Sequence, residues 1–224
     1  MSAGGSDSEL MAVSVEDDVV RPSYAMPVIF TFVPLLIGVG IAEGIHRGTG
    51  FTDYVAVIET DLRPRRLYWL YCSAVILAVL TRWLNGFGMA FKNAAMEAQG
   101  KAAKGNIRAN MYLYRSLDEP SRGATVLMEA GAAGQYNRAN RSLHHYIENL
   151  PGFFLCLPLA GYVYPAACFV LTGLFAIGRL LHQIGYSMHG YGGHGAGFGV
   201  SLVATVILEG LTFVAGMRAA GAPF

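Results

Sequence analysis

The sequence predicts an all-α integral membrane protein, and composition and the distribution of charge carry that prediction. The chain has 224 residues, of which 54% are hydrophobic and only 14% are charged, whereas soluble domains carry about a quarter charged residues. The hydrophobic residues gather in long uncharged stretches, and about 20 such residues suffice for a helix to cross a bilayer core of roughly 30 Å. This composition excludes a disordered chain and argues against a water-soluble globule.

Net charge and cysteine content narrow the function classes. The formal net charge of +1 gives no basic balance of the kind that nucleic-acid binders show, so no nucleic acid is expected as a partner. Cys72, Cys156 and Cys168 all lie inside apolar stretches. They are interpreted as small buried hydrophobic side chains and not as a disulfide framework.

The N-terminal part divides into a tail and a first span. Residues 1–21 are polar and acidic, with no Lys or Arg before Arg21, which fits neither a secretory signal nor a mitochondrial presequence. The uncharged stretch Pro22–Ala42 is long enough to span a membrane, and spanning helices tolerate its two prolines. We therefore expect an extra transmembrane helix over residues 22–45.

Four more spans are expected in the rest of the chain. Leu67–Phe91 opens with an interfacial aromatic cluster and contains one charge, Arg82. The uncharged stretch 149–178 is too long for one span, and a turn at 162–165 divides it into a helical hairpin, with helices over about 138–161 and 165–188. A glycine-rich connector at 189–199 leads to a last helix over 200–216.

Basic residues indicate how these spans are oriented. The polar loop at 92–140, together with Arg141, carries eight of the sixteen Lys and Arg residues. By the positive-inside tendency, this loop and the N-terminus face the cytosol or an equivalent compartment. The 189–199 connector then lies on the same side of the membrane.

Two polar stripes point to a ligand site on that side. Arg138, Arg141, His145 and Glu148 are spaced by three or four residues and share one helix face, as do Arg179, His182, Tyr186 and His189 on the next helix. Stripes of this kind suit an anionic ligand held between helices. The alternative is that the cations reach lipid headgroups while Glu148 pairs with Arg141.

The residues of these stripes resemble a known family, the membrane-associated proteins in eicosanoid and glutathione metabolism (MAPEG). The family pattern Arg-Ala-x-x-Asn-x-x-Glu, followed by Pro and Phe, is similar to Arg141-Ser-Leu-His-His145-Tyr-Ile-Glu148-Asn-Leu-Pro151-Gly-Phe153. The pattern Arg-x-x-Tyr-x-x-Gly-Tyr is similar to Arg179-Leu-Leu-His182-Gln-Ile-Gly185-Tyr186. The resemblance extends from about residue 136 to 216 and is closest to the type 3 microsomal glutathione transferase branch.

The resemblance implies a four-helix transmembrane bundle over residues 67–218, assembled as a homotrimer, with glutathione as co-substrate near the cytosolic face. It implies glutathione contacts by Arg141, Glu148 and Tyr186. Arg138, His145, His182 and Lys92 join them, Lys92 by a looser match. No metal is expected, since His144 and His145 point about 100° apart on a helix and no Cys or carboxylate completes a ligand set.

This chain departs from the family pattern at positions that matter for catalysis. His145 replaces an Asn, and His182 replaces a Tyr. The family's transferases carry a basic residue in the connector that stabilises the glutathione thiolate, whereas no Lys or Arg lies between Arg179 and Arg218 here. His189 and His194 are the candidates to replace it, because histidine can be protonated near neutral pH.

Two functions follow from these observations. The first is a glutathione transferase or peroxidase acting on lipophilic electrophiles or lipid hydroperoxides in the endoplasmic reticulum or an organelle inner membrane, such as the mitochondrial one. The second is a catalytically silent subunit of a larger respiratory or photosynthetic membrane complex. The extra helix, the N-terminal tail and the long loop would then be docking elements.

Overall fold

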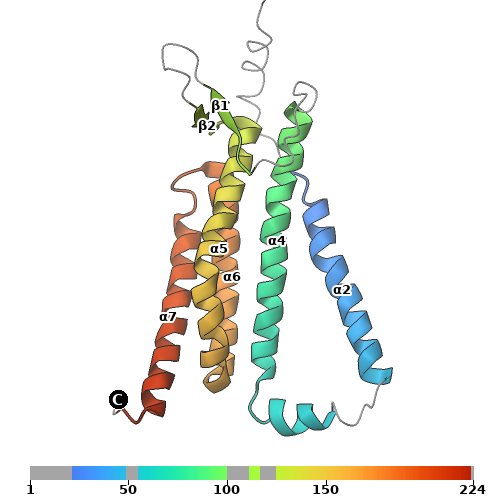
Figure 1. The fold of residues 1–224 in the computed structure, drawn as a ribbon, viewed down its shortest axis with the longest axis vertical. Coiled ribbons are helices and arrows are strands. Elements are labelled where there is room, and N and C mark those ends of the chain that lie inside the picture. Colours follow the sequence, from blue (N-terminus) through green and yellow to red (C-terminus); the bar gives the residue numbers. More distant parts are fainter. Residues whose placement is uncertain (1–21, 49–54, 100–110, 117–124, 223–224) are drawn as a thin grey trace, which may run out of the picture.

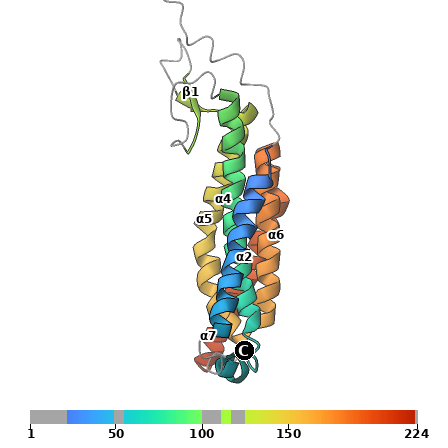
Figure 2. The same cartoon turned by 90° about the vertical axis from the view of Figure 1, so that its right-hand side faces the viewer.

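The computed structural model describes residues 22–48, 55–99, 111–116 and 125–222. Five long helices run side by side, and a small pair of strands lies at one end of them (Figures 1 and 2). The predicted tail at 1–21 falls outside the described residues. The elements in chain order are α2 (Ala25–Gly48), η1 (Ile58–Leu62), α4 (Tyr68–Gln99), β1 (Tyr114–Ser116), β2 (Thr125–Leu127), α5 (Gly131–Val163), α6 (Pro165–His189) and α7 (Gly195–Ala219).

The expected all-α membrane fold with an extra N-terminal helix is confirmed. Four of the described helices, namely α2, α4 over Tyr68–Asn93, α6 and α7, are long and apolar enough to cross a membrane. The fifth, α5, runs alongside them and contacts α4, α6 and α7 (Figure 1). Its first half carries the predicted polar stripe, and this explains why it is the least apolar of the five.

The connections are shorter than the sequence indicates. Residues 92–140 were expected to form a polar loop, but α4 continues to Gln99 and α5 begins at Gly131. Between them, β1 and β2 pair antiparallel, with Tyr114 opposite Leu127. The connector expected at 189–199 also contracts, because α6 ends at His189 and α7 begins at Gly195. Helical propensity in the Ala-rich flanks of the polar segment accounts for the added turns at 92–99 and 131–137.

Local sequence explains how the α5 to α6 hairpin turns. Pro165 occupies the first turn of α6, where its missing N–H leaves no intrahelical bond unmade. Gly190 ends α6 with a φ of 74°, a conformation that side chains disfavour. Pro151 and Pro158 lie within α5, as membrane helices tolerate when neighbouring helices support the freed carbonyls.

The main core lies between α4, α5, α6 and α7. Phe153 of α5 is fully buried and stacks on Phe175 of α6, with ring centroids 4.2 Å apart. A second cluster of buried residues joins the end of α4 to the start of α5 and includes Phe87, Phe91 and Leu113. Leu113 directly precedes β1, so this second cluster also fixes the strand pair to the bundle.

Helix α2 packs mainly on α4 and leaves most of its surface uncovered. Pro27 is buried over Gly86, where an added Cβ would come within 3.2 Å of the Pro27 Cα. Tyr24 approaches Phe87 with ring centroids 5.8 Å apart. Toward its C-terminal end α2 leans away from α4 (Figure 1), and Leu36 there is 68% exposed.

Candidate functional site

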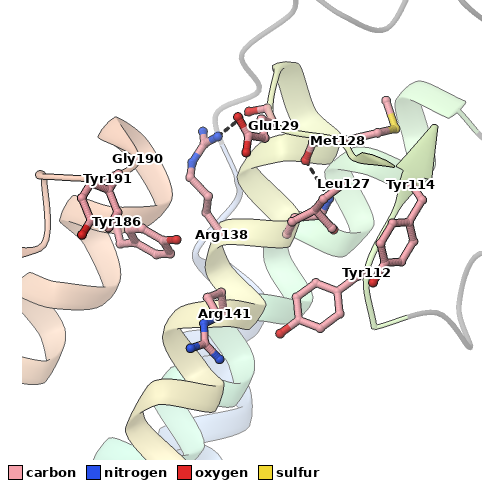
Figure 3. A pocket seen from close by; sticks show the side chains of 11 residues that line it. Tyr112, Tyr114, Leu127, Met128, Glu129, Arg138, Arg141, Tyr186, Gly190 and Tyr191 are labelled. Atoms are coloured by element: carbon pink, nitrogen blue, oxygen red, sulfur yellow. Dashed lines mark hydrogen bonds between the residues drawn. The ribbon is translucent and has the colours of Figure 1, made fainter. Parts of the chain in front are cut away.

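A pocket of about 500 Å³ opens at the end of the bundle where α5 begins and α6 ends (Figure 3). Arg138 and Arg141 project from α5, and Tyr186 and Tyr191 face them from α6 and the connector. The opposite wall comes from the residues beside the two strands. The full lining comprises Tyr112, Tyr114, Leu127, Met128, Glu129, Asn137, Arg138, Arg141, Tyr186, Gly190 and Tyr191.

A second pocket of about 250 Å³ adjoins the first and is richer in histidine. It shares Arg141, Tyr186 and Tyr191 with the first pocket. Its other lining residues are His145, His182, His194 and Phe198. The two pockets therefore meet at Arg141 and the two tyrosines, with a tyrosine-rich side toward the strands and a histidine-rich side toward α7.

Arg141 lies where the pockets meet and is only lightly restrained. Its Nη1 donates to Oε1 of Glu148 at 3.3 Å, and each of these side chains is 54% exposed. An exposed ion pair of this kind contributes little to stability, with a median of about 0–1 kcal/mol. Both groups thus remain accessible to a ligand that carries charges of both signs.

Arg138 is held more firmly. Its Nε donates to the Ser187 carbonyl at 3.2 Å, and its Nη1 donates to the Glu129 carbonyl at 2.5 Å. Burial lowers the pKa of Arg138 from its usual value, yet a guanidinium stays protonated in proteins. The side chain is therefore a fixed positive charge on the pocket wall.

His145 is oriented from behind by a buried arginine. Arg179, which is 2% exposed, donates to Nδ1 of His145 at 3.2 Å and to its carbonyl at 3.1 Å. A guanidinium has donors only, so the His145 Nδ1 must accept and the ring hydrogen lies on Nε2. Arg179 also lies over the rings of Tyr146 and Phe175, at 5.8 and 5.4 Å from their centroids.

The three histidines of the second pocket are in mutual contact. His182 stacks on His145 with ring centroids 5.0 Å apart, and its Nδ1 lies 2.8 Å from the Ser142 hydroxyl. His194 approaches His182 with a centroid distance of 5.2 Å and Tyr186 with one of 5.3 Å. Its Nδ1 is buried and has no hydrogen-bond partner among the described residues. His194 is thus the histidine with an unused buried nitrogen at the pocket.

Close contacts between glycines bring His194 to this position. A Cβ added at Gly185 would lie 2.0 Å from the Gly193 carbonyl oxygen, and one at Gly197 would lie 2.2 Å from the His182 backbone nitrogen. The connector therefore packs backbone to backbone on α6. Because no side chain fits at these positions, the residue that reaches the pocket from the connector is His194.

The structure brings together most of the site residues that the sequence predicts. Arg138, Arg141, His145, His182, Tyr186 and His194 line the two pockets. Glu148 joins them through Arg141, and this is also the pairing that the headgroup alternative expects. Lys92 on α4 and His189 at the end of α6 are not among the described lining residues of either pocket.

Sequence reasoning missed the tyrosine-rich wall. Tyr112 and Tyr114 flank the buried Leu113, and Tyr112 Oη lies 2.8 Å from Nδ1 of His144. Burial raises the pKa of Tyr112, so its hydroxyl remains protonated at neutral pH. The alternation Tyr112-Leu113-Tyr114 and the β-branched pair Thr125-Val126 are the strand signals that a closer search of the long loop would have found.

The fold and the pockets define a class of protein, a multi-helix membrane protein with a cationic, aromatic ligand site at one end of its bundle. A model of the MAPEG family matches residues 66–214, so the chain belongs to this family. The matched region runs from the start of α4 into α7 and leaves α2 outside. No curated protein and no solved structure matches the chain.

Family membership supports an integral membrane protein with a glutathione-related function, since members of this family generally use glutathione. Among the described residues, no group of three or more His, Cys, Asp or Glu side chains is arranged to hold a metal ion.

Proposed function

We propose that this protein is a glutathione transferase or peroxidase of the type 3 microsomal branch, acting on lipophilic electrophiles or lipid hydroperoxides. One observation carries the proposal. Side chains from two separate family-like motifs, Arg141 and His145 on α5 and His182 and Tyr186 on α6, line a single pocket. Glutathione carries two carboxylates and an ammonium group, which match a site that offers an accessible arginine and an accessible glutamate.

The proposed binding mode assigns each charge a partner. Arg141 binds a glutathione carboxylate in a bidentate way, and Glu148 accepts from the ammonium group. The Tyr186 hydroxyl and the donor Nε2–H of His145 supply neutral hydrogen bonds, with His182 stacked behind His145. The 54% exposure of both Arg141 and Glu148 supports a site completed by a neighbouring subunit of a homotrimer.

His194 is the proposed activator of the thiol. A neutral His194 takes the proton of the glutathione S–H and leaves a thiolate beside an imidazolium. In conjugation, the thiolate forms a bond to the electrophilic carbon, the leaving group departs with its electron pair, and His194 returns the proton to water. In peroxidase turnover, two glutathiones are oxidised to the disulfide while one hydroperoxide is reduced to an alcohol and water.

Glutathione binding to the purified full-length protein tests the proposal. Arg141→Ala is expected to weaken binding by about 1.5 to 3 kcal/mol, the usual size for a charge-assisted contact. Arg47→Ala is the matched control, because Arg47 also pairs with a glutamate four residues away and is 76% exposed at the far end of α2. An Arg141→Ala dissociation constant equal to that of the control would remove Arg141 from the site.

A second candidate function is a catalytically silent subunit of a larger respiratory or photosynthetic membrane complex. The observation that favours it is α2, which lies outside the family match and leaves apolar residues such as Leu36 and Ile41 more than half exposed. Purification in mild detergent separates the two functions. Stoichiometric co-purification with other polypeptides supports the subunit, whereas a homotrimer without other chains argues against it.

We also propose a multi-pass location in the endoplasmic reticulum or an organelle inner membrane, the mitochondrial one included. The strand-bearing end, where Arg138 and Arg141 lie, would face the cytosol or its equivalent. Lys92, at the same end of α4, would add to the positive potential that attracts glutathione, without contacting it directly.

A further inference from the structure

We infer that the larger pocket binds the acidic head group of an apolar second substrate, with Arg138 as its counter-charge and Asn137 as the positioning residue that holds the pocket wall. The inference rests on the proposed function, because it names the class of substrate that would react with glutathione in the adjoining pocket. That class is a lipid-like carboxylate, such as a fatty acid that bears a hydroperoxide or an electrophilic carbon.

The wall opposite Arg138 is built by the segments 111–116 and 125–129, here called the strand wall. Tyr112, Tyr114, Leu127 and Met128 of this wall line the pocket, and Figure 3 shows them across from Arg138 and Tyr186. Aromatic and apolar groups therefore face a cationic surface. A ligand that matches both surfaces is an anion with an apolar body, whereas glutathione has charges but no such body.

Asn137 ties the strand wall to α5. Its Nδ2 donates to the carbonyls of Leu113 and Met128, both at 2.8 Å, and its Oδ1 accepts from the Leu113 N–H at 2.7 Å. The side chain is 2% exposed. One amide thus satisfies three backbone groups in two segments that flank the strands, and each would cost free energy if left buried without a partner.

The turn that leads from the strand wall into α5 is equally specific. Gly131 has a φ of 56°, and a Cβ at Gly134 would lie 2.0 Å from the Glu129 carbonyl oxygen. The chain folds back this closely because no side chain intervenes. The same Glu129 carbonyl accepts from Arg138, so the turn that carries the wall also fixes the guanidinium.

Arg138 is suited to bind an acidic head group. Two of its nitrogens donate to the carbonyls of Ser187 and Glu129, so its position is set by both walls of the pocket. No printed contact engages its Nη2, and no carboxylate side chain forms an ion pair with it among the described residues. With Arg141 occupied by glutathione, Arg138 is the cation left for a second ligand.

Photolabelling of the full-length protein without glutathione tests the inference. The probes are a diazirine-bearing palmitic acid and its methyl ester, which differ in charge but share their apolar body. We expect labelling of peptides that contain Tyr112, Leu127 or Tyr191 to be about tenfold stronger with the acid than with the ester, the effect of one charge-assisted contact. Arg138→Gln should bring that ratio close to one, while Arg47→Gln leaves it unchanged.

Asn137→Ala should lower the same acid-to-ester ratio although Arg138 is still present, and the glutathione dissociation constant should stay within about twofold of wild type. A ratio near one in the wild-type protein, or a ratio that Arg138→Gln does not change, overturns the inference. Competition by glutathione for the acid probe also overturns it, because the pocket would then belong to glutathione. Loss of glutathione binding with intact acid labelling instead contradicts the proposed function alone.

Discussion

The contact between the connector and α6 leads to a specific prediction for Gly185→Ala. The added Cβ would lie 2.0 Å from the Gly193 carbonyl oxygen, whereas ordinary contacts begin at 3.4 Å, so the two backbones must separate by about 1.4 Å. His194 follows Gly193 directly and would move with it, away from His182 and Tyr186. Misplacement of a catalytic group by about 1 Å can cost about 100-fold in rate.

The matched control is Gly173→Ala on the same helix. No atom lies within 4 Å of a Cβ at Gly173, and both variants gain the same preference of alanine for a helix interior, roughly 0.5 to 1 kcal/mol. Relative to this control, Gly185→Ala is expected to lose about 1 to 3 kcal/mol of stability through overpacking.

The assay is conjugation of glutathione to a generic aromatic electrophile at saturating glutathione, with glutathione binding measured separately. We expect kcat to fall about 100-fold in Gly185→Ala, with little change in the glutathione dissociation constant, because Arg141 and Glu148 lie on α5. Activity equal to that of Gly173→Ala would show that the connector does not position the thiol activator, and the assignment of His194 would fail.

Two further predictions concern the buried residues below the site. Arg179→Met should leave the thermal unfolding midpoint unchanged or raised, since replacing a buried charge with an apolar side chain is often neutral or stabilising, while turnover falls because His145 loses its donor; a clearly lower midpoint would contradict this. Phe153→Ala should cost about 3 to 5 kcal/mol in unfolding free energy, whereas Phe154→Ala, at a position that is 61% exposed, should cost less than about 1 kcal/mol. Equal losses for the two phenylalanines would place the core elsewhere.

The helices and the end of the bundle that holds the site could be predicted from the sequence. Long uncharged stretches predict spanning helices because charge is costly in a bilayer, and residues three or four apart share a helix face wherever the helix packs. Arg141 and Tyr186 could therefore be assigned to one site before any coordinates were known. The family-like motifs carried the same information, since they lie on the two polar stripes.

The rest depends on contacts between segments that sequence spacing does not encode. Asn137 holds backbone groups 24 residues away, near Leu113, so the strand wall could not be inferred from local pattern alone. Arg179 shares a stripe with Tyr186 but is 2% exposed and contacts His145 instead of lining either pocket. Lys92 was matched to a ligand contact by its place at the end of a predicted helix, and α4 instead continues to Gln99.

The central claim is that this site binds glutathione and converts it to the thiolate with the help of His194. The most direct measurement is the ultraviolet difference absorbance of the thiolate when glutathione is added to the purified protein near neutral pH. The account predicts a saturable thiolate signal that is lost in His194→Gln while glutathione still binds. Glutathione that binds to the wild-type protein without any thiolate signal would contradict it and favour the catalytically silent subunit.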